Sequence, residues 1–191
     1  MGQPVLVVHS AGPQGPGEGS SAFVDRLRVE LGAGYEVLFP ILPDPDEPRY
    51  EPWSKALGEI LAETDAPPIV VGHSLGGSVF LKHLAESDRE ERIVGLVLVA
   101  TPYWGESEWE AEWALPEGWS DADTELPPIF LFHSRDDEEI PFEHLARYAR
   151  RLPAATGIPL DGNGHLFDRG DLGEITARIR GLSPDETRSA G

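Results

Sequence analysis

The chain has 191 residues with a hydrophobic share of 40%, which suits one globular domain and excludes a disordered chain. It contains no cysteine, so disulfides, thiolate catalysis and cysteine-ligated metal sites are excluded. The formal net charge of -19 opposes nucleic-acid binding, because a polyanion would be repelled. The simplest interpretation of the charge is a solubility surface, and the alternatives are attraction of cationic substrates or adaptation to a salty environment.

The apolar runs are too short to cross a bilayer, the longest being residues 68–72 and 93–100. The first residues show neither a secretory signal nor a myristoylation pattern. We therefore expect a cytoplasmic protein that does not bind membranes.

Short strand-like segments alternate with helix-like segments along the chain. In chain order we predict strand 4–9, helix 20–31, strand 35–39, a proline-rich loop 42–52, helix 53–63, strand 68–73, helix 75–85, strand 93–100, an irregular tryptophan-rich segment 103–123, strand 128–133, helix 142–152, strand 156–160 and helix 172–180. Ser20 or Ser21 is expected to cap the first helix. Pro159 places the last strand at a sheet edge.

This alternation predicts an α/β protein, with a six-stranded, mostly parallel sheet and helices on both faces. No linker divides the chain, so we expect a single domain over residues 1–182. Residues 183–191 are expected to form a flexible C-terminal tail.

The segment most informative about function reads Gly-His-Ser-Leu-Gly at residues 72–76. It lies directly between a predicted strand and a predicted helix, which is the context that the G-x-S-x-G motif requires. A serine at the tip of this turn projects from the sheet, while the glycines leave room for neighbouring elements. A serine can also cap a helix, but a cap does not need flanking glycines. We therefore predict that Ser74 is a nucleophile.

Several further segments, in this order, resemble the α/β hydrolases over nearly the whole chain. Within that superfamily the chain is similar to the small serine hydrolases related to retinoblastoma-binding protein nine. The matching segments are Gly-His-Ser-Leu-Gly-Gly at 72–77, Leu-Pro-Asp-Pro at 42–45, Ser-Arg-Asp-Asp at 134–137 with Ile-Pro at 140–141, and Gly-His at 164–165. The resemblance implies a minimal α/β-hydrolase fold with no large lid domain, no metal and no dissociable cofactor.

A serine hydroxyl needs a general base, and the base needs a group that orients it. In α/β hydrolases the acid and then the histidine follow the serine along the chain. Only His165 lies in a loop beyond the last predicted strand, among small residues, and we predict that it is the base. The other histidines lie on or beside strands and helices, and His83 and His144 are expected on solvated helix surfaces.

The acid should follow the strand 128–133, where Asp136 and Asp137 both qualify. Adjacent residues of an extended segment point to opposite sides, so only one of them can face His165. The resemblance selects Asp137, which stands four residues before Pro141. We then expect Asp136 to bind backbone groups in its own turn.

Two backbone N–H groups are expected to bind the substrate's carbonyl oxygen as it becomes negatively charged. One is the N–H of Leu75, the residue after the nucleophile. The other belongs to the loop after the first strand, where the resemblance gives Ala11 and Ser10 is the alternative.

Aromatic residues gather after the fourth predicted strand, at Tyr103, Trp104, Trp109, Trp113 and Trp119. They either pack this segment onto the domain or line a pocket for the acyl or leaving group. We expect Tyr103, Trp104, Trp109 and Trp113 to be the pocket residues.

The sequence therefore predicts a serine hydrolase that acts on carboxylic esters through an acyl-enzyme, with a small-molecule ester or amide as its partner. The alternatives are a non-catalytic binding module on the same fold, and an acyl transferase or amidase. We expect a monomer or a weak homodimer.

Overall fold

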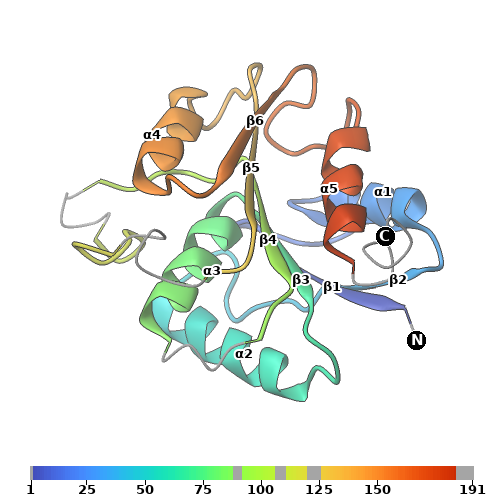
Figure 1. Cartoon of the computed structure of the whole chain (residues 1–191), viewed down its shortest axis with the longest axis horizontal. Helices are drawn as coiled ribbons and strands as arrows, with labels where there is room; N and C mark the ends of the chain where they lie inside the picture. The colour runs from blue at the N-terminus through green and yellow to red at the C-terminus, as the bar shows by residue number, and fades with distance from the viewer. Residues whose placement is uncertain (1, 88–91, 106–110, 120–125, 184–191) are drawn as a thin grey trace.

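The computed structural model describes residues 2–87, 92–105, 111–119 and 126–183. Its centre is a six-stranded parallel sheet in the order β2-β1-β3-β4-β5-β6 (Figure 1). The strands are β1 (Gln3–Val8), β2 (Tyr35–Leu38), β3 (Ile69–His73), β4 (Gly95–Val99), β5 (Ile129–Ser134) and β6 (Thr156–Leu160). The described residues also form helices α1 (Ser21–Leu31), α2 (Tyr50–Glu63), α3 (Leu75–Glu86), α4 (Glu143–Arg151) and α5 (Gly173–Leu182). The predicted fold class is confirmed.

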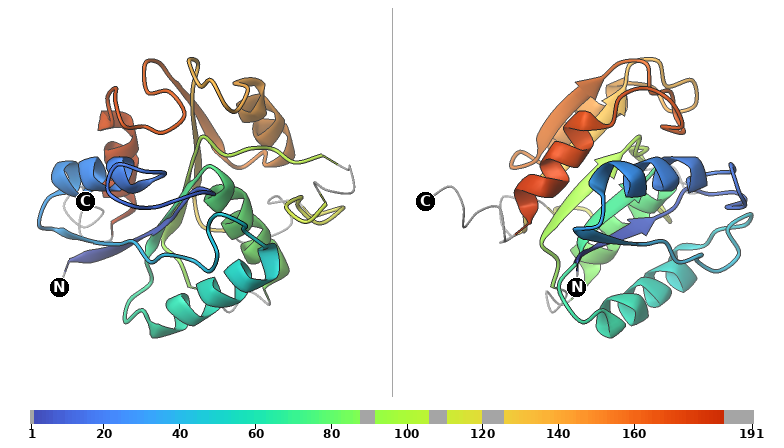
Figure 2. Two further views of the ribbon diagram at one scale, coloured as in Figure 1. Left: turned by 180° about the vertical axis from the view of Figure 1, so that it is seen from behind. Right: turned by 90° about the vertical axis from the view of Figure 1, so that its right-hand side faces the viewer.

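Helices cover both faces of the sheet, as Figures 1 and 2 show from three sides. One core lies between the sheet and α2, α3 and α4, and the other lies between the sheet and α1 and α5. Because side chains alternate along a strand, Val70 of β3 faces the first core, whereas Ile69 and Val71 face the second. All three are fully buried, which explains the continuous apolar pattern of this strand.

The start of α2 and the capping of α1 differ from the prediction, and several other element boundaries shift by one or two residues. Helix α2 begins at Tyr50, so Pro52 lies inside its first turn and not in the preceding loop. Proline is tolerated there because the first N–H groups of a helix have no acceptor within the helix. Ser20 occupies the N-cap position of α1, but neither it nor Ser21 caps the helix with its side chain, because both hydroxyls bond elsewhere.

The strand β6 lies at one edge of the sheet and contains Pro159, as predicted. Between β4 and β5, the described stretches 101–105, 111–119 and 126–128 contain only turns and irregular backbone, so no large lid domain is evident there. Trp109 and residues 184–191 of the predicted tail lie outside the described residues. Ser183, the first residue of that predicted tail, is buried and bonds through its N–H to the carbonyl oxygen of Arg180.

Over the described residues, no helix has both the length and the apolar character needed to span a bilayer. The cytoplasmic location and the monomer or weak homodimer stay predictions.

Candidate active site

Ser74 stands at the turn between β3 and α3 with a φ of 51° and a ψ of -127°, a strained conformation for a residue with a side chain. Its N–H bonds to the carbonyl oxygen of Val99, 2.9 Å away, which fixes the turn against β4. A Cβ on Gly76 would lie 2.3 Å from the carbonyl oxygen of Val8, and one on Gly72 would lie 2.5 Å from the Cα of Gly77. The two flanking glycines are therefore required by close backbone approach, as the sequence predicted.

Three side chains form a hydrogen-bonded chain at this turn. The Oγ of Ser74 lies 3.0 Å from Nε2 of His165, and Nδ1 of His165 lies 3.0 Å and 3.1 Å from the two carboxylate oxygens of Asp137. A carboxylate only accepts, so the imidazole carries its proton on Nδ1 and offers Nε2 to the serine hydroxyl. Ser74 and His165 are both nearly buried, and the Asp137 side chain is fully buried.

Hydrogen bonds surround the carboxylate of Asp137. Its Oδ1 accepts from the backbone N–H groups of Glu139 at 2.9 Å and Ile140 at 2.8 Å, and its Oδ2 lies 3.2 Å from Nε2 of His133. Burial acts to raise the pKa of Asp137, but the bonds from His133, His165 and Ile140 outweigh it and lower that pKa well below its usual range. Asp137 therefore stays ionised beside the His165 ring.

Asp136 holds the loop that carries His165. Its Oδ1 accepts from the backbone N–H groups of Gly162 at 3.0 Å and Gly164 at 3.2 Å, and also from the hydroxyl of Ser134. The expectation that it binds backbone groups in its own turn missed these two partners, because the β5 and β6 ends bring the two loops together. The hydrogen bond from Ser134 is the largest cause of a lowered pKa of Asp136.

The two predicted N–H donors come from different segments, one directly after Ser74 and the other from the loop after β1. Leu75 is the first residue of α3, so its N–H has no acceptor within the helix. After β1, the N–H of Ser10 bonds to Oγ of Ser20 at 2.8 Å and the N–H of Gly12 bonds to the carbonyl oxygen of Pro45 at 2.7 Å. Because the N–H of Ser10 already donates to Ser20, the N–H of Ala11 is the better candidate for the second donor.

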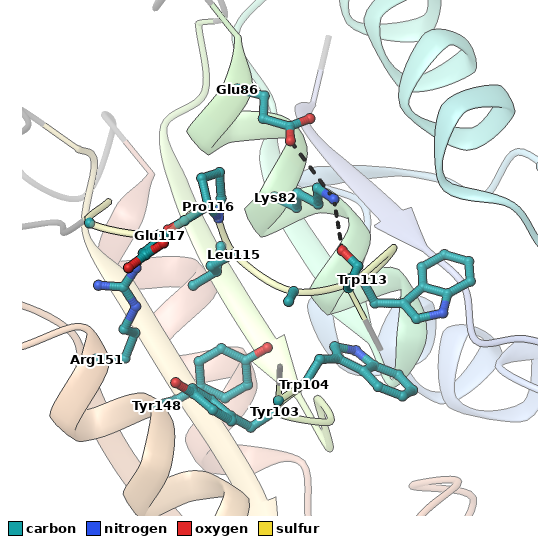
Figure 3. Close-up of a pocket in the computed structure, with 14 residues that line it drawn as sticks. Lys82, Glu86, Tyr103, Trp104, Trp113, Leu115, Pro116, Glu117, Tyr148 and Arg151 are labelled. Carbon is teal, nitrogen blue, oxygen red and sulfur yellow. Dashed lines mark hydrogen bonds and ion pairs between the residues drawn. The ribbon is translucent and has the colours of Figure 1, made fainter. Parts of the chain in front are cut away.

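Three of the aromatic residues after β4, Tyr103, Trp104 and Trp113, line a cavity of about 770 Å³ (Figure 3). Trp104 and Trp113 lie beside each other with ring centroids 6.3 Å apart, and Tyr103 packs against Tyr148 at 5.1 Å. Trp119 packs against the core. Both interpretations of this segment therefore have support, although neither Ser74 nor His165 is among the cavity's lining residues.

Two histidines are less exposed than predicted. His83 is buried, because α2 packs across α3 and places Oγ of Ser54 2.7 Å from its Nδ1. His144 is half-buried and accepts a hydrogen bond from the N–H of Tyr103 at 2.8 Å. Burial is the largest cause of the lowered pKa of His144.

Sequence reasoning also missed the contact of His133 with Asp137, and the contacts of His73 described below. The only signal was the position of His133 at the end of the strand that precedes the acid. In the described part of the chain, no group of three or more histidine and acidic side chains is arranged to hold a metal ion.

Comparison with known proteins gives a family and a fold. A model of the serine hydrolase family matches residues 42–179. No curated protein matches the chain in sequence. Solved structures that resemble it include the meta-cleavage product hydrolase of Pseudomonas fluorescens IP01, with a TM-score of 0.66, 18% identity, and coverage of 100% of this chain and 92% of the other.

Two further solved structures are similar. The ydeN gene product of B. subtilis has a TM-score of 0.69 and 19% identity, with 94% of this chain and 98% of the other covered. The mouse α/β hydrolase domain-containing protein 10 has a TM-score of 0.65 and 21% identity, with 94% and 88% covered. These matches confirm the α/β-hydrolase fold, and the family match is consistent with the resemblance to retinoblastoma-binding protein nine.

Proposed function

The chain belongs to the serine hydrolase family, and on this premise we propose that it hydrolyses carboxylic esters through an acyl-enzyme formed on Ser74. The observation that carries the proposal is the 3.0 Å separation between Oγ of Ser74 and Nε2 of His165. That distance is within the range over which a base can take a hydroxyl proton.

In the proposed reaction, Oγ of Ser74 attacks the ester carbonyl carbon while Nε2 of His165 takes its proton. The tetrahedral intermediate collapses when His165 returns this proton to the leaving alcohol. Water, deprotonated by His165, then attacks the acyl carbon. The bond from this carbon to Oγ of Ser74 breaks, Oγ takes the proton back from His165, and the acid is released. Asp137 holds the ring in the required tautomer and stabilises the imidazolium that forms twice in each cycle.

The N–H groups of Leu75 and Ala11 would bind the oxyanion, and each such donor is worth about 10²–10³-fold in rate. We further propose that the aromatic cavity holds the apolar part of the ester, since its size is in the range of ligand pockets. Its lining residue Tyr103 follows β4, the strand that pairs in parallel with β3 and ends at the same sheet edge as Ser74.

A fluorophosphonate probe tests the nucleophile, because it labels only an activated serine. We expect stoichiometric labelling of the native protein and none of Ser74→Ala. The matched control is Ser78→Ala, one turn further along α3. The Ser78 hydroxyl bonds to the carbonyl oxygen of Pro102, which keeps a second donor in the Tyr148 hydroxyl, so this variant should label normally. Native protein that takes no label would leave a binding module as the better interpretation.

A series of p-nitrophenyl esters of increasing chain length tests the substrate. Trp104→Ala should alter the chain-length preference of kcat/KM, while the shortest ester is hydrolysed as by the native protein. If the labelled protein cleaves amides, or transfers its acyl group, faster than it cleaves any ester, the assignment of an ester substrate is contradicted. The assignment of Ser74 as the nucleophile would still stand.

A further inference from the structure

We propose that His73 is a positioning residue, which locks the backbone beside His165 to the loop that carries Ala11 through one hydrogen-bonded relay. The proposal rests on the proposed function, because it assigns to His73 the alignment of the base with an oxyanion donor. His73 directly precedes Ser74 but takes no part in the hydrogen-bonded chain of Ser74, His165 and Asp137.

The first contact of the relay is to the base loop. Nε2 of His73 lies 2.9 Å from the backbone carbonyl oxygen of His165, and the two rings lie 5.6 Å apart between centroids at 34°. A carbonyl oxygen only accepts, so Nε2 of His73 carries a proton and donates it. The residue whose ring would take the serine proton is thus held at its own backbone by the neighbour of that serine.

The second contact leads to the loop after β1. Nδ1 of His73 lies 2.7 Å from Oγ of Ser20, which lies 2.8 Å from the N–H of Ser10. In a neutral ring with a proton on Nε2, Nδ1 is an acceptor, so the Ser20 hydroxyl donates to it and accepts from Ser10. The bonds run in one direction, from Ser10 through Ser20 and His73 to His165. Ser10 adjoins Ala11, so the relay begins beside the proposed oxyanion donor.

The surroundings of His73 keep its ring neutral, as the relay requires. The ring is fully buried and lies against Phe23 at 5.5 Å and Phe167 at 6.3 Å. Burial, and then repulsion from His165, lower the pKa of His73 to about 4, although its bond to the His165 carbonyl and the charge of Asp137 act in the other direction. His9 adds a further lowering. His73 therefore adds no second positive charge when His165 is protonated during the reaction.

The hydrogen bonds of Ser20 support a role in the relay and not in capping α1. It stands at the N-cap position of α1, where a serine hydroxyl ordinarily bonds to the helix backbone, but it makes no such bond. Its hydroxyl is instead buried between His73 and Ser10. Replacing Ser20 therefore breaks the relay without removing a side-chain cap from α1.

The test compares His73→Leu, which removes both polar atoms, with His73→Gln, which keeps one donor and one acceptor. With p-nitrophenyl butyrate we expect His73→Leu to lower kcat about 10²-fold with KM within about twofold, because misplacement of reacting groups by about 1 Å costs this much. His73→Gln should recover at least tenfold of the loss. The control Phe23→Leu, which alters the packing against the same ring, should keep the native kcat.

The Ser20→Ala variant provides a second test if the thermal transition shows that His73→Leu does not fold. Ser20→Ala should then lower kcat about tenfold or more with KM unchanged. The proposal would be overturned if folded His73→Leu kept the native kcat, or if the Leu and Gln variants lost equal activity. If His73→Leu is unfolded, a native kcat in Ser20→Ala would overturn it. Fluorophosphonate labelling separates the two questions, because the variants should still label slowly and completely, whereas absence of label on native protein would contradict the proposed function itself.

Discussion

The buried imidazole of His73 should make the protein less stable in mild acid. Its pKa is lowered to about 4, chiefly by burial, whereas in the unfolded chain it returns to about 6.5. Between these two values the unfolded chain binds more protons than the folded chain. The contribution of His73 to the free energy of unfolding is therefore fully present above pH 6.5 and is lost as the pH falls toward 4.

The size of this loss follows from the two pKa values. Lowering the pH from 7.5 to 4.5 should remove about 2–3 kcal/mol through His73 alone, since each pKa unit between the two states corresponds to about 1.4 kcal/mol. For a chain of 191 residues this corresponds to a fall in Tm of roughly 5–10 °C. The pKa values of His9 and His144 are also lowered by burial, so they act with the same sign.

Urea denaturation of the native protein and of His73→Gln, each at both pH values, isolates the contribution of His73. The other titrating groups are common to both proteins and cancel when the two pH-induced losses are subtracted. We expect the native protein to lose about 2–3 kcal/mol more than the variant. Equal losses in the two proteins would refute the assignment of a buried, neutral ring.

Three further substitutions test the site and the turn. Asp137→Asn should lower kcat about 10³–10⁴-fold by favouring the wrong tautomer of His165, measured with a p-nitrophenyl ester, and a loss below tenfold would argue against its orienting role. Asp136→Ala should free residues 162–164 and lower kcat roughly ten- to a hundredfold in the same steady-state assay, and native kcat would show that the loop holds its own position. Gly76→Ala places a Cβ 2.3 Å from the Val8 carbonyl oxygen, so it should lower Tm by at least about 4 °C, and an unchanged thermal transition would contradict the close approach.

The sheet and the turn at Ser74 could be predicted because both leave a local pattern in the sequence. Strand β3 is a continuous buried run, and the residues from Gly72 to Gly76 follow it directly. The roles of Asp136 and Asp137 could not be separated from the residues alone. Both follow β5 and both bind the loop around His165, one through backbone N–H groups and the other through the ring.

The environment of His83 could not be predicted, because it depends on which helix packs across α3. The apolar spacing of α3 identifies one buried stripe but not the second contact, in which α2 brings Ser54 to the imidazole. The same limit applies to His73, whose partners Ser20 and His165 lie far away in the chain. His133 lies only four residues before Asp137, but their contact depends on how the chain turns after β5. Spacing within one element carries no information about such contacts.

The two edge strands of the sheet, β2 and β6, influence how copies of the protein could associate. Strand β2 has four residues and includes Glu36, while β6 includes Pro159, which has no N–H to donate to an additional strand. Short length, charge and proline each discourage the pairing of an edge with another molecule. A continuous sheet running through two copies is therefore disfavoured, and self-association would have to use helical surfaces or loops.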